Sequence, residues 1–573
     1  MKTASLLVLN LMFALCSLGQ LIQVDAASVI RSFDHRPAAV NLNYLMDDDS
    51  YLNPAIPLSQ SLSQMGIGTL RYPGGEKSDN YLWSVPPYTQ ANPQFATPGN
   101  CNWPNNQTTF SSNYINPLPT TLDFDEFMTL CQTLKIKPLI VVSGDAQFNT
   151  FCPTPTSLAS LITNATEWIK YANLTHSYKI KNWAIGNESF NSAAYDAPPT
   201  ATQYANDFKQ FSIAMKAMDP TISVIANAKS GPWVDTLVSI AGPYIDAIAV
   251  SNYPIYNWTN GYDTYRSGSP NLVSEINAVL SAVSATSIHV IVTEYNSIDW
   301  GNAWSGDNDL GHALVNFQLF GDQMSIPKVE DAYIWTTRWI DNATNPQHIY
   351  DALDANGGLN ATGKALAMWG NNLLSQLVST TNNGYINSFA TKNSAGDSLN
   401  IFLINKDYVA HTASVSIANY AALSLPGLQV SASRLSGSSP SDKVPVITVP
   451  SGSISVSGST LTSQLSPFSI TVIQLRQAPH DTTTSPPVIT GLLSQRADIR
   501  SMIAYPNPVH NVLEVTFEGA ITHEEEIRLV NGMGQQVYSG KTPSQKMSIS
   551  MAEFPQGIYL LLIGNFKKVI VKE

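Results

Sequence analysis

Between about residue 36 and residue 340, short apolar runs alternate with longer stretches in which apolar residues recur at helical spacing. The short runs are continuously apolar and bounded by polar residues, which is typical of parallel strands buried on both faces. The longer stretches are typical of amphipathic helices. The predicted strands are Ala38–Tyr44, Gly68–Tyr72, Pro138–Ser143, Asn182–Gly186, Ser223–Ala226, Ala247–Ser251, His289–Thr293 and Ala332–Trp335. The predicted helices include Leu122–Leu134, Ser157–Ala172, Tyr204–Met218, Asn271–Val283 and Leu310–Met324.

This alternation predicts an α/β fold of the (β/α)8, or TIM barrel, type over residues 27–371. The main alternative is a doubly wound open sheet. No Gly-rich phosphate-binding loop follows the first predicted strand, so the sequence does not support that alternative.

The pattern changes after the predicted barrel. Residues 372–477 lose helical periodicity and show short alternating segments, which predicts an antiparallel β-sandwich. Residues 478–498 begin with a Thr/Pro-rich stretch and are predicted to be an extended linker. Residues 499–573 are predicted to form a small all-β module.

Composition narrows the classes of function. Charged residues make up only 13% of the chain and hydrophobic residues 44%, so the protein is globular and its polar surface is mostly uncharged. A net charge of −12 without any Lys/Arg run argues against a nucleic-acid partner. The nine His residues are scattered, so neither a metal nor an organic cofactor is expected. No Gly-x-Ser-x-Gly segment follows a strand, so serine-hydrolase chemistry is unsupported.

The first residues have the features of a secretory signal peptide. Lys2 precedes an apolar stretch from Leu6 to Leu18, and small residues follow near Ala26 and Ala27. This pattern predicts a signal peptide over residues 1–26, with cleavage after Ala26. The remaining cysteines, Cys101, Cys131 and Cys152, permit one disulfide and one free thiol, and the sequence leaves their pairing open.

Two glutamates are the strongest candidates for chemistry. Glu188 directly follows the fourth predicted strand, and Glu294 directly follows the seventh. Carboxylates at the C-terminal ends of barrel strands point into the cleft where TIM barrels carry their active sites. Cleavage of a glycosidic bond uses two such carboxylates. The sequence therefore predicts a secreted glycoside hydrolase.

The segments around these glutamates resemble a known group. The pair Asn187-Glu188 after strand four, with a glutamate ending strand seven, resembles the retaining glycoside hydrolases with (β/α)8 barrels in the clan often labelled A. The segment Leu70-Arg71-Tyr72-Pro73-Gly74-Gly75 resembles that of α-L-arabinofuranosidases and, more loosely, of the heparanase-like and β-xylosidase families. The resemblance covers roughly residues 36–477, including a β-sandwich that packs beside the barrel in these families.

The resemblance implies roles for individual residues. Glu188 would be the general acid/base and Glu294 the nucleophile of a double displacement with net retention. Asn187 would hydrogen-bond the sugar 2-hydroxyl. Arg71 would lie near Glu294 and hold that carboxylate ionised, while a less polar environment would raise the pKa of Glu188. Tyr253 would hydrogen-bond the nucleophile.

Aromatic residues complete the expected sugar site. The resemblance places Trp335 as the floor of the sugar subsite, and aromatic faces stack on the CH surfaces of sugars. The long insertion from Asp79 to Thr121 is expected to form a wall at one end of the cleft. Further candidates for sugar stacking in loops are Trp83, Trp103, Trp300, Trp304 and Trp339.

The chain departs from its resembled families at two sugar-contacting positions. Glu76 follows the double glycine where arabinofuranosidases have Asn, and Asn252 precedes Tyr253 where several relatives have His. The identity of the sugar, its linkage and the choice between internal and terminal attack therefore stay open.

The C-terminal module has its own resemblance. The segments Ala504-Tyr505-Pro506-Asn507-Pro508 and Pro555-Gln556-Gly557-Ile558-Tyr559, with a basic C-terminal strand, resemble the sorting domain of type IX secretion. This resemblance implies contact with outer-membrane secretion machinery and a location outside the cell or on its surface. A carbohydrate-binding β-module is the alternative.

Two other functions use the same fold. One is a non-catalytic polysaccharide-binding or adhesion protein, and the other is a transglycosylase that uses the same glutamates but excludes water. Of the three, the glycosidase accounts best for two glutamates at the ends of the right strands. The expected partner is a polysaccharide or a derived oligosaccharide, and the expected state is a monomer.

Overall fold

The computed structural model describes residues 20–96, 121–148, 155–191, 198–268, 270–339, 348–450, 454–477, 498–520, 526–531, 536–541, 546–563 and 566–573. The chain divides into two compact units, Met1–Pro479 and His480–Glu573. The predicted linker lies mostly outside the described residues, as do Trp103, Cys101 and Cys152. Cys131 is described, and it is buried and free.

The first unit contains a closed parallel barrel of eight strands, in the order β10-β11-β2-β3-β6-β7-β8-β9. All eight predicted strands are present, so the predicted TIM barrel is confirmed. The barrel strands are β2 (Ala38–Asn41), β3 (Thr69–Tyr72), β6 (Lys137–Val142), β7 (Asn182–Ile185), β8 (Ser223–Asn227), β9 (Ala247–Asn252), β10 (His289–Tyr295) and β11 (Val329–Ile334).

Small and branched side chains fill the inside of the barrel, which explains why the strands are apolar on both faces. One face of each strand packs outward against helices, and the other packs inward. The inward cluster consists of Ala39, Leu139, Val141, Ala184, Ile225, Ala247, Ala249, Ile291 and Tyr333. Each of these side chains is at most 4% exposed.

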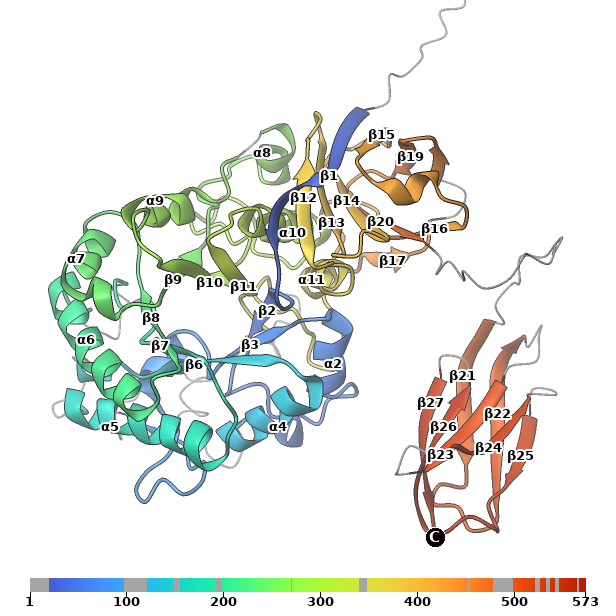
Figure 1. Cartoon of the computed structure of the whole chain (residues 1–573), viewed down its shortest axis with the longest axis horizontal. Coiled ribbons are helices and arrows are strands. Elements are labelled where there is room, and N and C mark those ends of the chain that lie inside the picture. Colours follow the sequence, from blue (N-terminus) through green and yellow to red (C-terminus); the bar gives the residue numbers. More distant parts are fainter. Residues whose placement is uncertain are drawn as a thin grey trace, which may run out of the picture. The chain divides into compact units, whose positions relative to one another are not determined.

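Helices surround the barrel strands (Figure 1). Several of them begin at a side-chain cap. Asp123 and Glu126 form a capping box at α4, and Thr200 and Gln203 form another at α6, which satisfies free N–H groups of the first turn. The helices are α1 (Asp49–Leu52), α2 (Leu58–Met65), α4 (Phe124–Leu134), α5 (Leu158–Ile169), α6 (Ala201–Met218), α7 (Pro232–Ala241), α8 (Tyr262–Ser267), α9 (Ser274–Ala282), α10 (Leu310–Met324) and α11 (Ala361–Gly370).

A ten-stranded sheet follows the barrel, in the order β17-β16-β20-β14-β13-β12-β1-β15-β19-β18. Neighbouring strands are antiparallel except for the pair β1–β15. Strands far apart in this order, such as β19 and β20, share one apolar core, as expected of a predicted β-sandwich. The strands are β1 (Gln20–Ser32), β12 (Gln376–Thr380), β13 (Ile386–Lys392), β14 (Ser398–Asn405), β15 (His411–Ala418), β16 (Leu428–Ser436), β17 (Val446–Thr448), β18 (Ile454–Ser457), β19 (Thr460–Leu465) and β20 (Ser469–Gln477).

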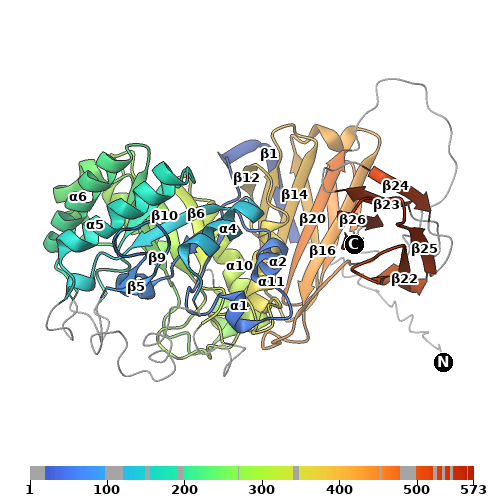
Figure 2. The ribbon, with the colours of Figure 1, turned by 90° about the horizontal axis from the view of Figure 1, so that it is seen from below.

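Strand β1 was not expected in this sheet. It begins at Gln20, so residues 20–26 of the predicted signal peptide lie within a paired strand. Figures 1 and 2 show this blue strand among the yellow and orange strands of the sheet. The sequence missed it because an alternating, partly polar segment directly after an apolar leader also fits the end of a signal peptide.

The sheet packs firmly on the barrel through aromatic side chains. The Trp369 ring of α11 stacks on Phe402 of β14 with centroids 4.1 Å apart, and on Phe317 of α10 at 4.7 Å. The loop between β16 and β17 also contacts α10, since the Leu310 and Gly311 N–H groups donate to the carbonyls of Asp442 and Pro440. Barrel and sheet therefore form one continuous unit.

The second unit is all-β, as predicted. It contains a three-stranded sheet, β21-β22-β25, and a four-stranded sheet, β24-β23-β26-β27. Side chains from both sheets share one small core. The strands are β21 (Asp498–Tyr505), β22 (Val512–Ala520), β23 (Glu526–Asn531), β24 (Gln536–Lys541), β25 (Lys546–Ser550), β26 (Gly557–Ile563) and β27 (Phe566–Lys572).

The barrel interior gives a stability prediction. Ile291→Ala removes a fully buried side chain from the inward cluster, and the expected loss in the free energy of unfolding is about 2–5 kcal/mol. Ile213→Ala is the matched control, because Ile213 on α6 is half exposed and its loss should change stability by less than about 1 kcal/mol. Denaturant unfolding of both variants measures the difference, and equal losses would contradict a packed barrel interior.

Candidate active site

A cavity of about 850 Å³ lies at the C-terminal ends of the barrel strands. Glu188, which follows β7, and Glu294, near the end of β10, both line it. The structure thus brings together the two carboxylates that the sequence singled out. The other lining residues include Glu76, Asn187, Phe190, Asn191, Lys229, Asn252, Tyr253, Glu275, Trp300, Trp335, Trp339 and Tyr350.

The buried guanidinium of Arg71, in β3, organises this end of the barrel. Its Nη1 donates to Glu294 Oε1 and to Asn41 Oδ1, both at 2.9 Å. Its Nη2 donates to Asn187 Oδ1 at 2.6 Å. A cation that is only 2% exposed needs such charged and polar partners to offset its desolvation. The predicted proximity of Arg71 to Glu294 is therefore present as a direct ion pair.

The two oxygens of Glu294 have different partners. Oε1 accepts from Arg71, and Oε2 accepts from the Tyr253 hydroxyl at 2.8 Å. These two contacts fix the plane and direction of the carboxylate. Because Arg71 occupies Oδ1 of Asn187, the amide NH2 of Asn187 is the group left to donate into the cavity.

The pKa of Glu294 differs from the expectation. Burial and the negative charge of Glu188 together raise it to about 7, although Arg71 and Tyr253 lower it. The sequence predicted that Arg71 lowers the pKa of this carboxyl group, which it does. It did not predict that burial raises the same pKa more strongly. A carboxyl group that is 5% exposed loses most of its hydration, and this loss outweighs a single ion pair.

Two backbone hydrogen bonds hold the turn that carries Glu188. Glu188 itself has a left-handed backbone, with φ of 45°, and lies two residues after Gly186, whose φ is 69°. The Asn187 N–H donates to Asp79 at 3.1 Å, and the Ser189 N–H donates to Asn227 at 2.8 Å. These contacts on both neighbours hold a conformation that a non-glycine residue seldom adopts alone.

Side-chain hydrogen bonds also hold Glu188 and its turn. Asn191 Nδ2 donates to Glu188 Oε2 at 3.1 Å, so one carboxylate oxygen is directed by its own loop. Ser189 Oγ donates to Asp145 at 2.6 Å and closes the turn against the loop after β6. Asp145 therefore supports this turn.

The last position of the Pro-Gly-Gly segment, Gly75, has no room for a side chain. A Cβ at this position would lie 2.6 Å from Glu294 Oε1 and equally close to the Trp335 ring. Any side chain here would collide with both. The backbone of the loop after β3 thus forms part of the wall beside Glu294.

Aromatic residues form much of the cavity lining. Trp335 lies there as predicted, with the Trp339 ring 5.7 Å away, and Trp300 packs edge-on against Tyr253. Of the other predicted stacking candidates, Trp83 is fully buried and packs on Trp168 in the core. Trp304 stacks on His312 and is not among the lining residues.

The two departures from the resembled families both lie at the cavity. Glu76 lines it and contacts the Lys77 ammonium, which is buried and sits 4.0 Å from the centre of the Trp339 ring. Burial lowers the pKa of Lys77, against the opposing effect of Glu76. Asn252 is buried and donates to the Leu272 carbonyl at 3.0 Å. At the two positions where this chain departs from the resembled families, it therefore carries a carboxylate, Glu76, and an amide, Asn252.

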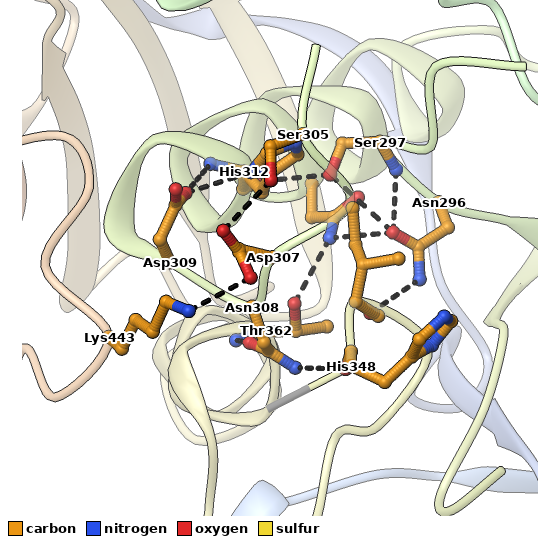
Figure 3. A network of polar contacts seen from close by, with 12 residues as sticks. Asn296, Ser297, Ser305, Asp307, Asn308, Asp309, His312, His348, Thr362 and Lys443 are labelled. Carbon is orange, nitrogen blue, oxygen red and sulfur yellow. Dashed lines mark hydrogen bonds and ion pairs between the residues drawn. The ribbon is translucent and has the colours of Figure 1, made fainter. Parts of the chain in front are cut away.

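A polar network anchors the segment after Glu294 (Figure 3). Asn296 Nδ2 donates to the carbonyls of Trp335 and Ile349, and its Oδ1 accepts from Asn316 of α10. Asn316 also donates to Thr362 of α11 at 3.3 Å. The strand that carries Glu294 is therefore tied to the chain at Trp335 and to two helices behind it.

A second cluster of titratable groups lies at the opposite end of the barrel. One potential ligand atom from each of His35, Glu330 and Asp331 lies within 4.8 Å of the others. His35 contacts Asp331 through Nε2, at 2.6 Å, and Asp34 through Nδ1. Burial lowers the pKa of His35, but the hydrogen bonds and charges of these carboxylates outweigh burial, so the pKa is raised overall.

Three supporting residues escaped the sequence analysis. Asn41 ends β2 and holds both Arg71 and, through Nδ2, the carbonyl of Thr293 beside Glu294. Asp79 and Asn227 hold the turn at Glu188. Asn41 and Asn227 are polar residues at strand ends, which is the signal that could have found them. Asp79 lies in an insertion, where sequence alone gives no indication of its partner.

The electrostatics of Glu294 can be tested by pH-difference infrared spectroscopy, with Glu294→Gln subtracted to isolate its carboxyl band. The carboxylate fraction should rise with pH around an apparent pKa of about 7. Glu188→Gln should lower this pKa by removing a like charge, whereas Arg71→Met and Tyr253→Phe should raise it. Arg476→Met, in the sheet, is the control and should leave it unchanged. A value near 4.5 in the unaltered protein would contradict the dominance of burial.

Part of the chain is similar to known proteins. Residues 61–269 match the family model described as alpha-L-arabinofuranosidase 1 domain. The α-L-arabinofuranosidase C of Emericella nidulans is 26% identical over 269 residues, which are 43% of this chain and 46% of that protein. A probable α-L-arabinofuranosidase C of Aspergillus fumigatus is 27% identical over 259 residues, with the same shares of both chains. The chain thus spans about half the length of the curated relatives it matches.

Solved structures show a similar fold. The α-L-arabinofuranosidase of Thermotoga maritima superposes with a TM-score of 0.59 at 18% identity, over 80% of this chain and all of that one. The family 51 α-L-arabinofuranosidase of Bifidobacterium longum gives 0.59 at 14% identity, over 80% and 99% of the two chains. A β-xylosidase of Caulobacter crescentus gives 0.52 at 12% identity, over the same shares.

The C-terminal module also has a match. Residues 503–573 match the family model of the secretion system C-terminal sorting domain, which indicates export across the outer membrane. Among the described residues, no helix combines the length and apolar character needed to cross a bilayer. The chain therefore has a TIM barrel that is in part similar to the alpha-L-arabinofuranosidase 1 domain, followed by a β-sheet domain and a C-terminal segment that matches a secretion sorting domain.

Proposed function

We propose that this protein is a secreted retaining glycoside hydrolase that releases α-L-arabinofuranosyl residues from a polysaccharide or a derived oligosaccharide. The observation that carries the proposal is the pairing of Glu188 and Glu294 in one cavity, with both oxygens of Glu294 held by Arg71 and Tyr253. The match to an arabinofuranosidase domain supports the choice of sugar.

In the first step, the Glu188 carboxyl group protonates the leaving oxygen while the Glu294 carboxylate attacks the anomeric carbon. Glu188 suits the first role because it is partly exposed and lines the cavity from the turn after β7. Glu294 suits the second because its two contacts fix its direction before the substrate arrives. A covalent glycosyl ester forms on Glu294, and the alcohol leaves.

In the second step, water attacks the same carbon and Glu188 takes its proton. Esterification removes the negative charge of Glu294, so the carboxylate of Glu188 no longer faces a like charge when it acts as a base. The free NH2 of Asn187 would donate to the sugar 2-hydroxyl, a contact that strengthens in the transition state. The product keeps the configuration of the substrate.

The lining of the cavity suits a neutral sugar. Trp335, Trp339 and Trp300 offer apolar faces, and Asn187 offers an amide. Aromatic faces and amide groups recognise the CH and OH groups of sugars without a charge on the ligand. Glu76 adds an acceptor for hydroxyl groups, where the resembled families have an amide that both donates and accepts.

A substrate panel tests the proposed activity. The full exported chain should release L-arabinose from 4-nitrophenyl α-L-arabinofuranoside and from arabinoxylan or arabinan, and NMR should detect the α-anomer first. Release from 4-nitrophenyl β-D-xyloside and β-glucan should be at least about 10-fold slower, because discrimination between sugars rests on a few hydrogen bonds. If the protein cleaved only these two substrates, the proposed specificity for arabinofuranosides would be refuted, but the proposed glycosidase activity would stand.

Other outcomes of the panel separate the alternatives. Binding to arabinoxylan without product would favour the non-catalytic protein, and transfer to an acceptor sugar without free arabinose would favour the transglycosylase. Inverted product would refute the covalent ester on Glu294.

The nucleophile has a direct test. Glu294→Ala should lower kcat/KM by on the order of 10⁴-fold. Added azide should restore turnover and give a glycosyl azide of inverted configuration, because the small anion fills the vacated space and attacks once. Glu167→Ala, on the outer face of α5, is the control and should retain full activity. Near-normal activity of folded Glu294→Ala would rule out this role.

A further inference from the structure

Strand β1 lies inside the ten-stranded sheet, between β12 and β15. Residues Gln20 to Asp25 pair in parallel with Ala413 to Ala418 of β15. The later part of β1 pairs antiparallel with β12, from Val24 opposite Thr380 to Ser32 opposite Gln376. The first residues of the strand therefore complete the hydrogen bonding of β15 on one side.

The same residues contribute to the core of the sheet. Ile22, Val24 and Ala26 are each at most 1% exposed and pack among the strands around them. Burial of such aliphatic side chains is a main source of folding stability. Loss of the segment would also leave N–H and C=O groups of β15 unpaired at a new sheet edge.

A signal peptidase that cut after Ala26 would remove these residues. The mature chain would then lack half of β1, three core side chains and the partner of β15. Because folded domains are only marginally stable, this loss would remove a large part of the stability of the sheet. The structure is consistent with a cut only at or before Gln20.

The sequence directly before Gln20 contains such a site. Ser17-Leu18-Gly19 places small residues at the third and first positions before the Gly19–Gln20 bond, and the apolar stretch ends immediately ahead of it. A small-x-small pattern after an apolar stretch is what signal peptidases recognise. Val24-Asp25-Ala26 matches this pattern less well, with a branched residue in the third position.

We propose that Gly19–Gln20 is the signal-peptidase cleavage site and that the mature chain begins at Gln20, the first residue of β1. Hydrolysis adds water across this amide, which leaves a carboxylate on Gly19 and a free amine on Gln20. The leader is thus residues 1–19, and the strand that follows is part of the mature fold. This inference is independent of the proposed activity, because it concerns only processing and the sheet.

N-terminal peptide mass spectrometry of the exported full-length protein tests the site. The expected first residue is Gln20, either with a free amine or cyclised with loss of ammonia. A mature chain that starts at Ala27 would overturn the proposal. Gly19→Phe should block the cut and accumulate the uncleaved precursor at least about 10-fold over the unaltered chain, as a bulky residue does not fit next to the scissile bond.

Gln23→Phe is the matched control. It places the same bulky side chain on the exposed face of β1, outside Ser17-Leu18-Gly19, and processing should be unchanged. Normal processing of Gly19→Phe would overturn the proposed site.

A second measurement tests the structural argument without the peptidase. Chains that begin at Gln20 and at Ala27 are produced without a leader and compared by thermal unfolding. The shorter chain should unfold at a lower temperature or fail to fold, because it lacks Ile22, Val24 and Ala26. Equal unfolding temperatures for the two chains would refute the requirement for residues 20–26.

Discussion

The buried charge of Arg71 is the constraint on which the candidate site depends. A guanidinium that is almost fully withdrawn from water is tolerated only with well-placed partners, and here they are Glu294, Asn41 and Asn187. These partners belong to β10, β2 and the turn after β7, while Arg71 itself belongs to β3. One cation therefore sets the relative positions of four strand ends. Removal of any one partner leaves charge without compensation, which is costlier than loss of an ordinary surface contact.

The same charge only partly balances the acidic groups around it. Glu294 faces Glu188 across the cavity, and burial adds to their repulsion, so the pKa of Glu294 stays raised despite Arg71 and Tyr253. In the proposed reaction one carboxyl group donates a proton while the other attacks as a carboxylate. The raised pKa of Glu294 means that the fraction of Glu294 in this ionised form grows as the pH rises through about 7. Hydrogen bonds from uncharged groups add to this arrangement. Asp79 and Asn227 accept from the backbone on either side of Glu188, and Asn296 holds the segment after Glu294.

Much of this architecture could be predicted from hydrophobic pattern. The eight barrel strands and the positions of Glu188 and Glu294 follow from short apolar runs, because strands buried on both faces leave a clear periodic signal. Tyr253, Asn187 and Arg71 followed from local motifs. Asp79 and Asn41 did not, because their partners lie far away in sequence and nothing local reveals a long-range hydrogen bond. Trp83 illustrates the opposite error, since a tryptophan in an insertion looks like a sugar contact but completes an aromatic core. The pKa of Glu294 depends on burial in three dimensions, which strand order alone does not determine.

The position of β1 has a consequence for the order of folding. Its contacts are extremely non-local: the Gln23 N–H bonds to Thr381 across 358 residues, and Asn419 bonds to Asp25 across 394. Contacts of such long range form late and slowly, because a large loop must close first. Strand β1 is synthesised first, and it therefore cannot pair until strands several hundred residues later in the chain have been synthesised. The barrel strands, which pair largely with their sequence neighbours, can assemble before it. The ten-stranded sheet is completed only when the two ends of the first unit meet, so its pairing stays incomplete until late in synthesis.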